Sequence, residues 1–204
     1  TETSPVHMGL PRYGMKKPGS VGIPFPDTEV KLIDPDSGEI VPVEEPGELV
    51  VKGPQVFTEG YHNKPEETAT TLRDGWIFTG DVCKMDADGY FYVVDRVKDM
   101  VIVSGYKVFT RTVDDVLMEH PDIDMAAAIG MTNPARPGSE IVATAIVLKP
   151  DVEKSEDTRE KIIQYMQAKV APYKVPKKIE FMDELPLSAV GKVLKRELRE
   201  LMKS

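Results

Sequence analysis

Three charged residues of this sequence, Asp81, Arg96 and Lys192, have side chains that suit phosphate and sugar oxygens. Asp81 lies on a predicted turn, where a carboxylate can accept hydrogen bonds from two neighbouring hydroxyl groups. Arg96 carries a permanently charged planar fork that fits phosphate or ribose oxygens. Lys192 follows Gly191 on a loop before the predicted last helix, so its long cationic side chain can swing into a cleft.

Each of these residues also has an ordinary structural explanation. An aspartate on a turn commonly caps its own loop, Arg96 can pair with a neighbouring aspartate, and an isolated lysine is usually a solvated surface charge. Gly191-Lys192 is not a Walker phosphate loop, because the upstream glycine spacing is missing and Val193 stands where Ser or Thr is required. Residue type alone therefore leaves both explanations open.

The first half of the chain is rich in Pro and Gly, and its short alternating runs predict strands at 28–33, 47–52 and 90–94. Turn residues separate these runs at 34–38 and 86–89. We therefore expect a small antiparallel β-barrel or sheet. A short surface helix is predicted over 64–72, with Pro65 tolerated in its first turn.

The second half mixes helical and strand periods and predicts an α+β domain. Val113, Val116 and Leu117 mark a helix that ends near 120–121, and strands are expected at 125–129, 141–148 and 177–182. Asp157 and Glu160 form a predicted capping pair for a helix that Pro172 stops. The residues expected to face inward in that helix and in the last one are Ile162, Ile163, Met166, Val170, Leu194, Leu198 and Leu201.

A charged segment at 95–99, followed by an apolar strand and a Ser-Gly turn, divides the chain into these unlike halves. Buried charges need partners, so such a junction is expected to be solvated or to face a polar cleft. The predicted fold class is α+β, with a β subdomain over 1–95, a hinge over 96–99 and a mobile α+β lid domain over 100–204. A plain interdomain linker is the alternative.

Composition excludes some classes of function. The net charge of −8 argues against a nucleic-acid partner, whose phosphates need a basic face.

The single cysteine, Cys83, cannot form an intramolecular disulfide. We expect a cytoplasmic protein in which Cys83 is a small buried hydrophobe. The three histidines have no ligand spacing, and the acidic run at 84–95 is expected to be a hairpin because Lys84 replaces the first ligand of a calcium loop.

Several motifs occur in an order that is similar to one known superfamily. They are Lys17-Pro18-Gly19-Ser20-Val21-Gly22, Pro46-Gly47-Glu48-Leu49, Gly60-Tyr61, Thr79-Gly80-Asp81, Asp95-Arg96-Val97-Lys98-Asp99, Ser104-Gly105-Tyr106-Lys107 and Leu185-Pro186-Leu187-Ser188-Ala189-Val190-Gly191-Lys192. Together they resemble the C-terminal part of the adenylate-forming ligases, which include acyl-CoA synthetases, luciferases and peptide-synthetase adenylation domains. Long-chain fatty-acyl-CoA synthetases look most similar. The family's large N-terminal domain is not matched, so we expect a fragment that is inactive by itself.

The resemblance implies ATP and Mg²⁺ as cofactors and CoA as a substrate, with a fatty acid or other carboxylate activated as acyl-AMP. By this resemblance Asp81 binds the ribose of ATP, Arg96 contacts ribose and phosphate, and Glu2 helps to hold Mg²⁺. Lys192 would be catalytic, contacting the carboxylate and the α-phosphate during adenylation.

The second half-reaction of the family implies roles for the segment after the hinge. Rotation about Lys98 would bring Ser104, Gly105, Tyr106 and Lys107 to the active site, where they would line the channel for CoA. This chain departs from the family pattern at Thr110 and Thr112, which stand where relatives usually carry Pro and Glu. Any role in the CoA channel at Thr112 is therefore in doubt.

Two other functions remain open from the sequence. One is an adenylation domain that loads a carrier protein, and the other is a non-catalytic lid that only binds a partner. The expected partners are fatty acid, ATP, CoA and the N-terminal domain of the same polypeptide. Peripheral membrane contact and a homodimer are also left open.

Overall fold

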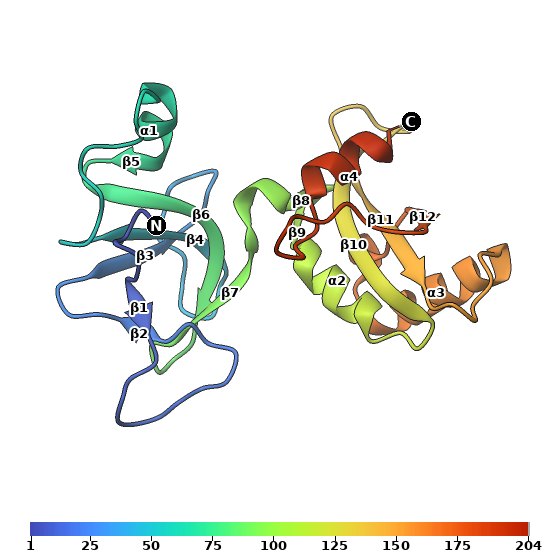
Figure 1. Cartoon of the computed structure of the whole chain (residues 1–204), viewed down its shortest axis with the longest axis horizontal. Helices are drawn as coiled ribbons and strands as arrows, with labels where there is room; N and C mark the ends of the chain where they lie inside the picture. Colours follow the sequence, from blue (N-terminus) through green and yellow to red (C-terminus); the bar gives the residue numbers. More distant parts are fainter. Residues whose placement is uncertain (204) are drawn as a thin grey trace. The chain divides into compact units, whose positions relative to one another are not determined.

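The computed structural model describes residues 1–203, and the chain divides into two compact units, 1–98 and 99–204. The boundary lies within the segment where the sequence predicts a hinge. Figure 1 colours the first unit blue to green and the second green to red. No helix among residues 1–203 combines the length and apolar character that a membrane span requires.

The first unit is built on an antiparallel sheet in which β4 and β6 are central (Figure 1). Its strand order is β3-β4-β6-β5, and β7 also pairs with β6. The elements are β1 (Met8–Gly9), β2 (Ile23–Pro24), β3 (Glu29–Ile33), β4 (Gly47–Lys52), α1 (Pro65–Thr71), β5 (Leu72–Arg73), β6 (Trp76–Met85) and β7 (Phe91–Arg96). The predicted antiparallel sheet is therefore confirmed, as is the short helix that begins at Pro65.

Apolar side chains from the strands form the core of this unit. Val51, Ile77 and Cys83 are buried together with Phe91. Burial raises the pKa of the Cys83 thiol to about 12, so it is not a reactive thiolate. The prediction of a buried, inert cysteine is confirmed.

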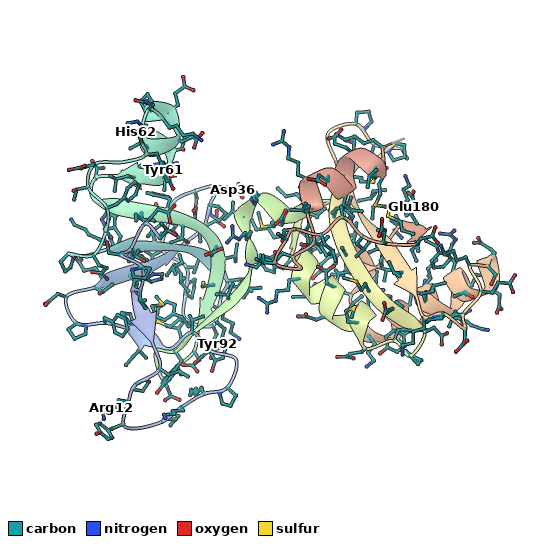
Figure 2. The ribbon with its side chains drawn as sticks, in the orientation of Figure 1. Arg12, Asp36, Tyr61, His62, Tyr92 and Glu180 are labelled. Atoms are coloured by element: carbon teal, nitrogen blue, oxygen red, sulfur yellow. The ribbon has the colours of Figure 1, made fainter. Side chains whose placement is uncertain are left out.

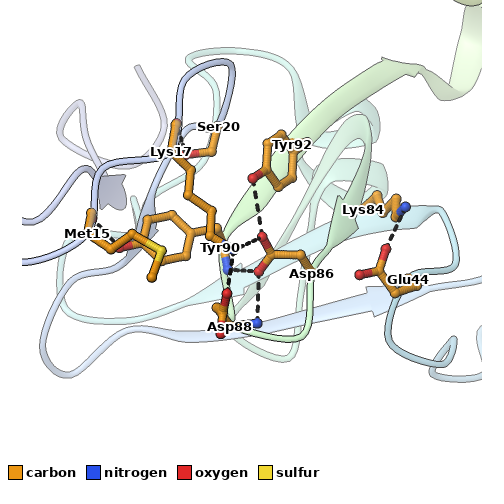
Figure 3. Close-up of polar contacts among 9 residues, drawn as sticks. All are labelled: Met15, Lys17, Ser20, Glu44, Lys84, Asp86, Asp88, Tyr90 and Tyr92. Carbon is orange, nitrogen blue, oxygen red and sulfur yellow. Dashed lines mark hydrogen bonds and ion pairs between the residues drawn. The ribbon is translucent and has the colours of Figure 1, made fainter.

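The turn between β6 and β7 is tied to the loop before β2 by the ion pairs of Lys17 (Figure 3). Lys17 Nζ lies 2.5 Å from Asp86 Oδ2 and 2.6 Å from Asp88 Oδ2. The other carboxylate oxygen of Asp86 accepts the backbone N–H groups of Asp88 and Tyr90. These contacts, led by the bond from Lys17, lower the pKa of Asp86 to about 2. The acidic run at 84–95 is thus a hairpin, as predicted.

Asp86→Asn is expected to lower the melting temperature near neutral pH, and this effect is expected to vanish as the pH falls below 2. The pKa of Asp86 is depressed on folding from its ordinary value of 3.8 to about 2, so its contribution is present above about pH 4 and lost as the pH falls through 2. Thermal unfolding of both proteins across this range measures the effect. An equal difference in melting temperature at every pH would contradict it.

The second unit has a mixed three-stranded sheet in the order β10-β11-β12, in which β11 pairs antiparallel with β10 and parallel with β12. A separate hairpin, β8-β9, precedes it. The elements from the boundary onward are η1 (Val97–Asp99), β8 (Val101–Val103), β9 (Tyr106–Val108), α2 (Thr110–Met118), β10 (Ile123–Thr132), β11 (Glu140–Leu148), α3 (Glu156–Lys169), η2 (Pro172–Lys174), β12 (Lys178–Met182) and α4 (Lys195–Leu201).

Helices cover both faces of this sheet, which explains why β10 and β11 are apolar at most positions. Ala128, Val142 and Ile146 pack in one cluster with residues of α2 and α3. Their neighbours in the strands, including Ala127 and Ala143, pack in a second cluster with α4. Alternate residues of the strands therefore pack into two different apolar clusters, one on each face of the sheet. The predicted α+β class is confirmed.

Two details of the predicted helices are wrong. The N-cap of α3 is Ser155, whose hydroxyl accepts the N–H of Thr158, and not the Asp157 and Glu160 pair. Serine is among the preferred N-cap residues, and it stands one residue before the helix begins. In α4, Leu201 is 52% exposed, whereas Met202 is buried beside Leu198.

A polar contact inside the second unit links α2 to the start of α4. Lys195 Nζ lies 2.8 Å from Thr110 Oγ1 and 2.9 Å from Asp114 Oδ2. The second oxygen of Asp114 accepts the N–H of Ala128 in β10. Thr110 therefore supplies a side-chain acceptor for Lys195 at the start of α2.

Candidate functional site

The Thr79-Gly80-Asp81 segment is a bulge in β6. Glu48 of β4 pairs with Val82, and Val50 pairs with Phe78, so these three residues stand opposite Leu49 alone. On the other edge of β6, β5 pairs with residues 76–77 and β7 with 81–85, which leaves 78–80 between the two partners. The bulge therefore interrupts the strand pairing on both edges of β6, within a sheet that is otherwise well paired.

Specific contacts fix the shape of this bulge. The Thr79 hydroxyl donates to the Leu49 carbonyl at 2.8 Å and accepts the N–H of Asp81 at 3.1 Å. The N–H of Gly80 donates to Glu48 Oε1 at 3.1 Å. Gly80 has a φ of +70°, a conformation that glycine adopts without steric cost. The sequence predicted a turn here. The register of β4 and β6 places three residues opposite Leu49, and the Thr79 hydroxyl and the positive φ of Gly80 allow the chain to form this bulge.

Asp81 and Arg96 are direct partners across β6 and β7, with Arg96 Nε 3.1 Å from Asp81 Oδ1. Their side chains are 32% and 56% exposed, so the pair contributes little to stability but stays accessible to a ligand. The ordinary role considered for Arg96 was an ion pair with a neighbouring aspartate, and the structure shows an ion pair whose partner is Asp81 on the adjacent strand.

Both residues line a cavity of about 1100 Å³ in the first unit, which is large enough for a nucleotide. Glu2 and Lys98 lie in its wall too, so the structure brings together four of the predicted site residues. Tyr61 and Asp36, labelled in Figure 2, mark two other segments of the lining. The wall carries the cations Arg73, Arg96 and Lys98 and the carboxylates Glu2, Asp36, Glu48 and Asp81.

Glu2 is held by the segment around Tyr61. The Tyr61 hydroxyl donates to Glu2 Oε1 at 2.8 Å, and the N–H of Phe57 donates to the Glu2 carbonyl at 2.9 Å. The bond from Tyr61 lowers the pKa of Glu2, so the carboxylate stays ionised. One accessible carboxylate beside a cavity fits Mg²⁺, which proteins bind through one or two carboxylates together with phosphate oxygens.

Glu48 and His7 are wall residues to which the sequence analysis assigned no role. Glu48 belongs to the Pro-Gly-Glu-Leu motif, where it had no assigned role; it is half-buried, and burial raises its pKa. His7 contacts Thr3 Oγ1 at 3.2 Å, and burial lowers its pKa, which favours the neutral ring. No local signal marks Glu48, because its partner is the backbone N–H of Gly80 on another strand.

The junction between the units is anchored on each side by an ion pair. Arg96 pairs with Asp81 in the first unit, and Asp99 Oδ1 lies 3.0 Å from Arg199 in the second. Only Val97 and Lys98 separate these anchors, and both belong to the short helix η1.

In the second unit, Ser104 and Gly105 are the two central residues of the β8-β9 hairpin. Both have positive φ, +51° and +89°, as a tight two-residue turn requires. Tyr106 stacks on Tyr173 with ring centroids 4.5 Å apart, and it remains 58% exposed. Lys107 follows in β9. The four predicted CoA-channel residues therefore lie together in one hairpin, with Ser104, Gly105 and Tyr106 exposed and Lys107 half-buried.

Lys192 lies on a tight turn and is exposed. Ser188 and Lys192 are joined by two bonds: the N–H of Ser188 donates to the Lys192 carbonyl at 2.8 Å, and the N–H of Lys192 donates to Ser188 Oγ at 3.1 Å. Leu187 and Val193 form a β-bridge next to this turn. Hydrogen bonds therefore hold the backbone of this turn, and the Lys192 side chain is exposed at its end.

Comparisons with known proteins show the family to which this chain is similar. The family model for "AMP-binding enzyme" matches residues 1–62, and the one for "AMP-binding enzyme C-terminal domain" matches 112–192. A long-chain-fatty-acid–CoA ligase from Bacillus subtilis is 45% identical over 98% of this chain and 35% of its own length. A feruloyl-CoA synthase from an Amycolatopsis species is 42% identical over 98% of this chain and 39% of its own.

Solved structures of the same class share the fold. ATP-bound MatB from Rhodopseudomonas palustris superposes with a TM-score of 0.86 and 32% identity, covering 99% of this chain and 39% of that protein. The chain spans about a third of the length of the first relatives. Both family models match in order, and similarity extends along nearly the whole sequence. The chain therefore belongs to the family of AMP-binding enzymes.

Proposed function

We propose that this chain acts as the C-terminal part of an ATP-dependent acyl-CoA ligase, which activates a fatty acid as acyl-AMP and transfers the acyl group to CoA. The observation that carries the proposal is the Asp81 and Arg96 pair, 3.1 Å apart at the cavity wall. A carboxylate next to a guanidinium suits a ribose that bears hydroxyls and a nearby phosphate. ATP occupies a solved relative, which supports a nucleotide here.

In the adenylation step, residues of this chain would bind and orient the nucleotide. Asp81 would accept hydrogen bonds from the ribose hydroxyls, and Arg96 would hold ribose and phosphate oxygens. Glu2 would hold Mg²⁺, which neutralises phosphate charge when bound. Lys192 would reach the carboxylate substrate and the α-phosphate, where negative charge develops in the transition state.

In the thioester step, the β8-β9 hairpin would replace Lys192 at the active site. Rotation about Lys98 would bring Ser104, Gly105, Tyr106 and Lys107 to the path of the CoA thiol. Fatty acids are the proposed substrates because the most similar relatives include long-chain-fatty-acid–CoA ligases. The cytoplasmic location, the membrane contact and the homodimer stay predictions from the sequence.

The test is an enzyme in which this chain follows the N-terminal part of the Bacillus subtilis relative, here called the composite ligase. It is expected to exchange pyrophosphate into ATP when a fatty acid is present. The 204-residue chain by itself is expected to show only background exchange. A folded composite ligase that binds ATP but adenylates no carboxylate would contradict the proposal.

Asp81→Ala in the composite ligase is expected to raise KM for ATP by about 10- to 100-fold, because hydrogen bonds to a charged group contribute about 1.5–3 kcal/mol. Pyrophosphate exchange at varied ATP measures this. Glu29→Ala is the matched control, since Glu29 is an exposed carboxylate on the same sheet and lies outside the cavity. Equal KM values for Asp81→Ala and the control would remove Asp81 from the nucleotide site.

A further inference from the structure

Glu48 is the one carboxylate of β4, and its position is unusual for a strand that otherwise carries buried apolar residues at 49–51. It is half-buried, and burial raises its pKa, which means that the ionised form is disfavoured where it lies. The positive charge of Arg73 lowers the pKa of Glu48, and the negative charge of Asp81 raises it. A carboxylate that is partly buried in this way needs a hydrogen bond that offsets the cost of its burial.

The backbone N–H of Gly80 donates this hydrogen bond to Glu48 at 3.1 Å, in the middle of the bulge that ends at Asp81. Gly80 has more backbone freedom than either neighbour in the bulge, because it has no side chain. Thr79 is already fixed by its hydroxyl, and Asp81 by its register with Arg96. The bond from Glu48 therefore restricts the least constrained residue of the bulge.

We propose that Glu48 is a positioning residue for the nucleotide site, which holds the amide of Gly80 and so keeps the bulge in the shape that directs Asp81 into the cavity. The inference rests on the proposed function for its effect on ATP. Glu48 acts through Gly80 and Asp81, and the ribose contact itself belongs to Asp81.

The first half of the test uses the 204-residue chain and needs no enzyme activity. Glu48→Ala is expected to accelerate hydrogen exchange at the Gly80 amide by about 10- to 100-fold and to change its proton chemical shift. Glu48→Gln keeps an oxygen acceptor and is expected to preserve most of the protection. Exchange at the Gly80 amide that is the same in Glu48→Ala and in the unmodified chain would overturn the proposal.

The second half measures KM for ATP and kcat in the composite ligase. Glu48→Ala is expected to raise KM for ATP about tenfold with kcat nearly unchanged, and Glu48→Gln to restore it, because the lost contact acts on binding. Glu29→Ala is the control on the neighbouring strand. A faster-exchanging Gly80 amide with unchanged KM would overturn the positioning role.

The two proposals fail in different ways. If Asp81→Ala leaves KM for ATP unchanged, the proposed function is wrong and the effect of Glu48 on ATP falls with it. If Asp81→Ala raises KM but Glu48→Ala does not, only the role of Glu48 is wrong. Equal loss of folding in Glu48→Ala and Glu48→Gln, seen by circular dichroism, would show a structural role and overturn positioning.

Discussion

Lys192→Ala in the composite ligase is expected to slow acyl-adenylate formation by about 100- to 1000-fold. Removing one preorganised group that stabilises developing charge typically costs about 2.7–4 kcal/mol. Lys192 fits this role because the tight turn that begins at Ser188 holds its backbone while the side chain stays exposed. Pyrophosphate exchange measures adenylation, and thioester formation from supplied acyl-AMP is expected to continue.

Lys161→Ala serves as the matched control for Lys192. Lys161 is also an exposed lysine of the second unit, and its ion pair with Asp157 lies within α3. The control is expected to leave both half-reactions near the rate of the unmodified enzyme. Equal losses of adenylation and thioester formation in Lys192→Ala would mean that Lys192 supports the fold and does not serve the first step alone.

The sequence predicted the elements well where a single pattern determines them. The strand at 47–52 has the predicted bounds, and its apolar residues at 49–51 are buried in the core of the first unit. The end of α4 was harder to predict. Leu201 and Met202 are both apolar neighbours, and only the packing against β10 and β11 decides that Met202 is the buried one.

The candidate site was predictable as a set of residues but not as a geometry. Asp81 and Arg96 are fifteen positions apart, and their ion pair depends on the register of β6 and β7. That register includes an irregularity between Val82 and Cys83, which shifts the pairing by one residue and has no local signal in the sequence. Glu48 was missed for the same reason, since its partner is a backbone amide on another strand.

Lys98→Pro in the composite ligase is expected to retain one half-reaction and to lose the other. Proline fixes φ near −65° and disfavours helical values at the preceding residue, Val97. These two residues are the only ones between the ion pairs that anchor Arg96 to the first unit and Asp99 to the second. A change of orientation between the units therefore has few other backbone dihedrals to use.

Lys98→Ala is the matched control, because it removes the same side chain and leaves φ free. Any loss of activity that both variants share is caused by removal of the Lys98 side chain, which lies in the cavity wall. A loss found only with proline belongs to the backbone. The melting temperature is expected to change little, since Lys98 is not part of any of the three apolar clusters.

The decisive comparison is pyrophosphate exchange against thioester formation from preformed acyl-AMP, measured on the same preparations. Loss of one reaction with proline, while alanine keeps both, would place the hinge at Lys98. Because η1 contains Val97 and Lys98, the conformation that the proline disfavours includes the helical one seen here. If the proline variant keeps both reactions at the rates of the unmodified enzyme, the units do not alternate by rotation at this residue.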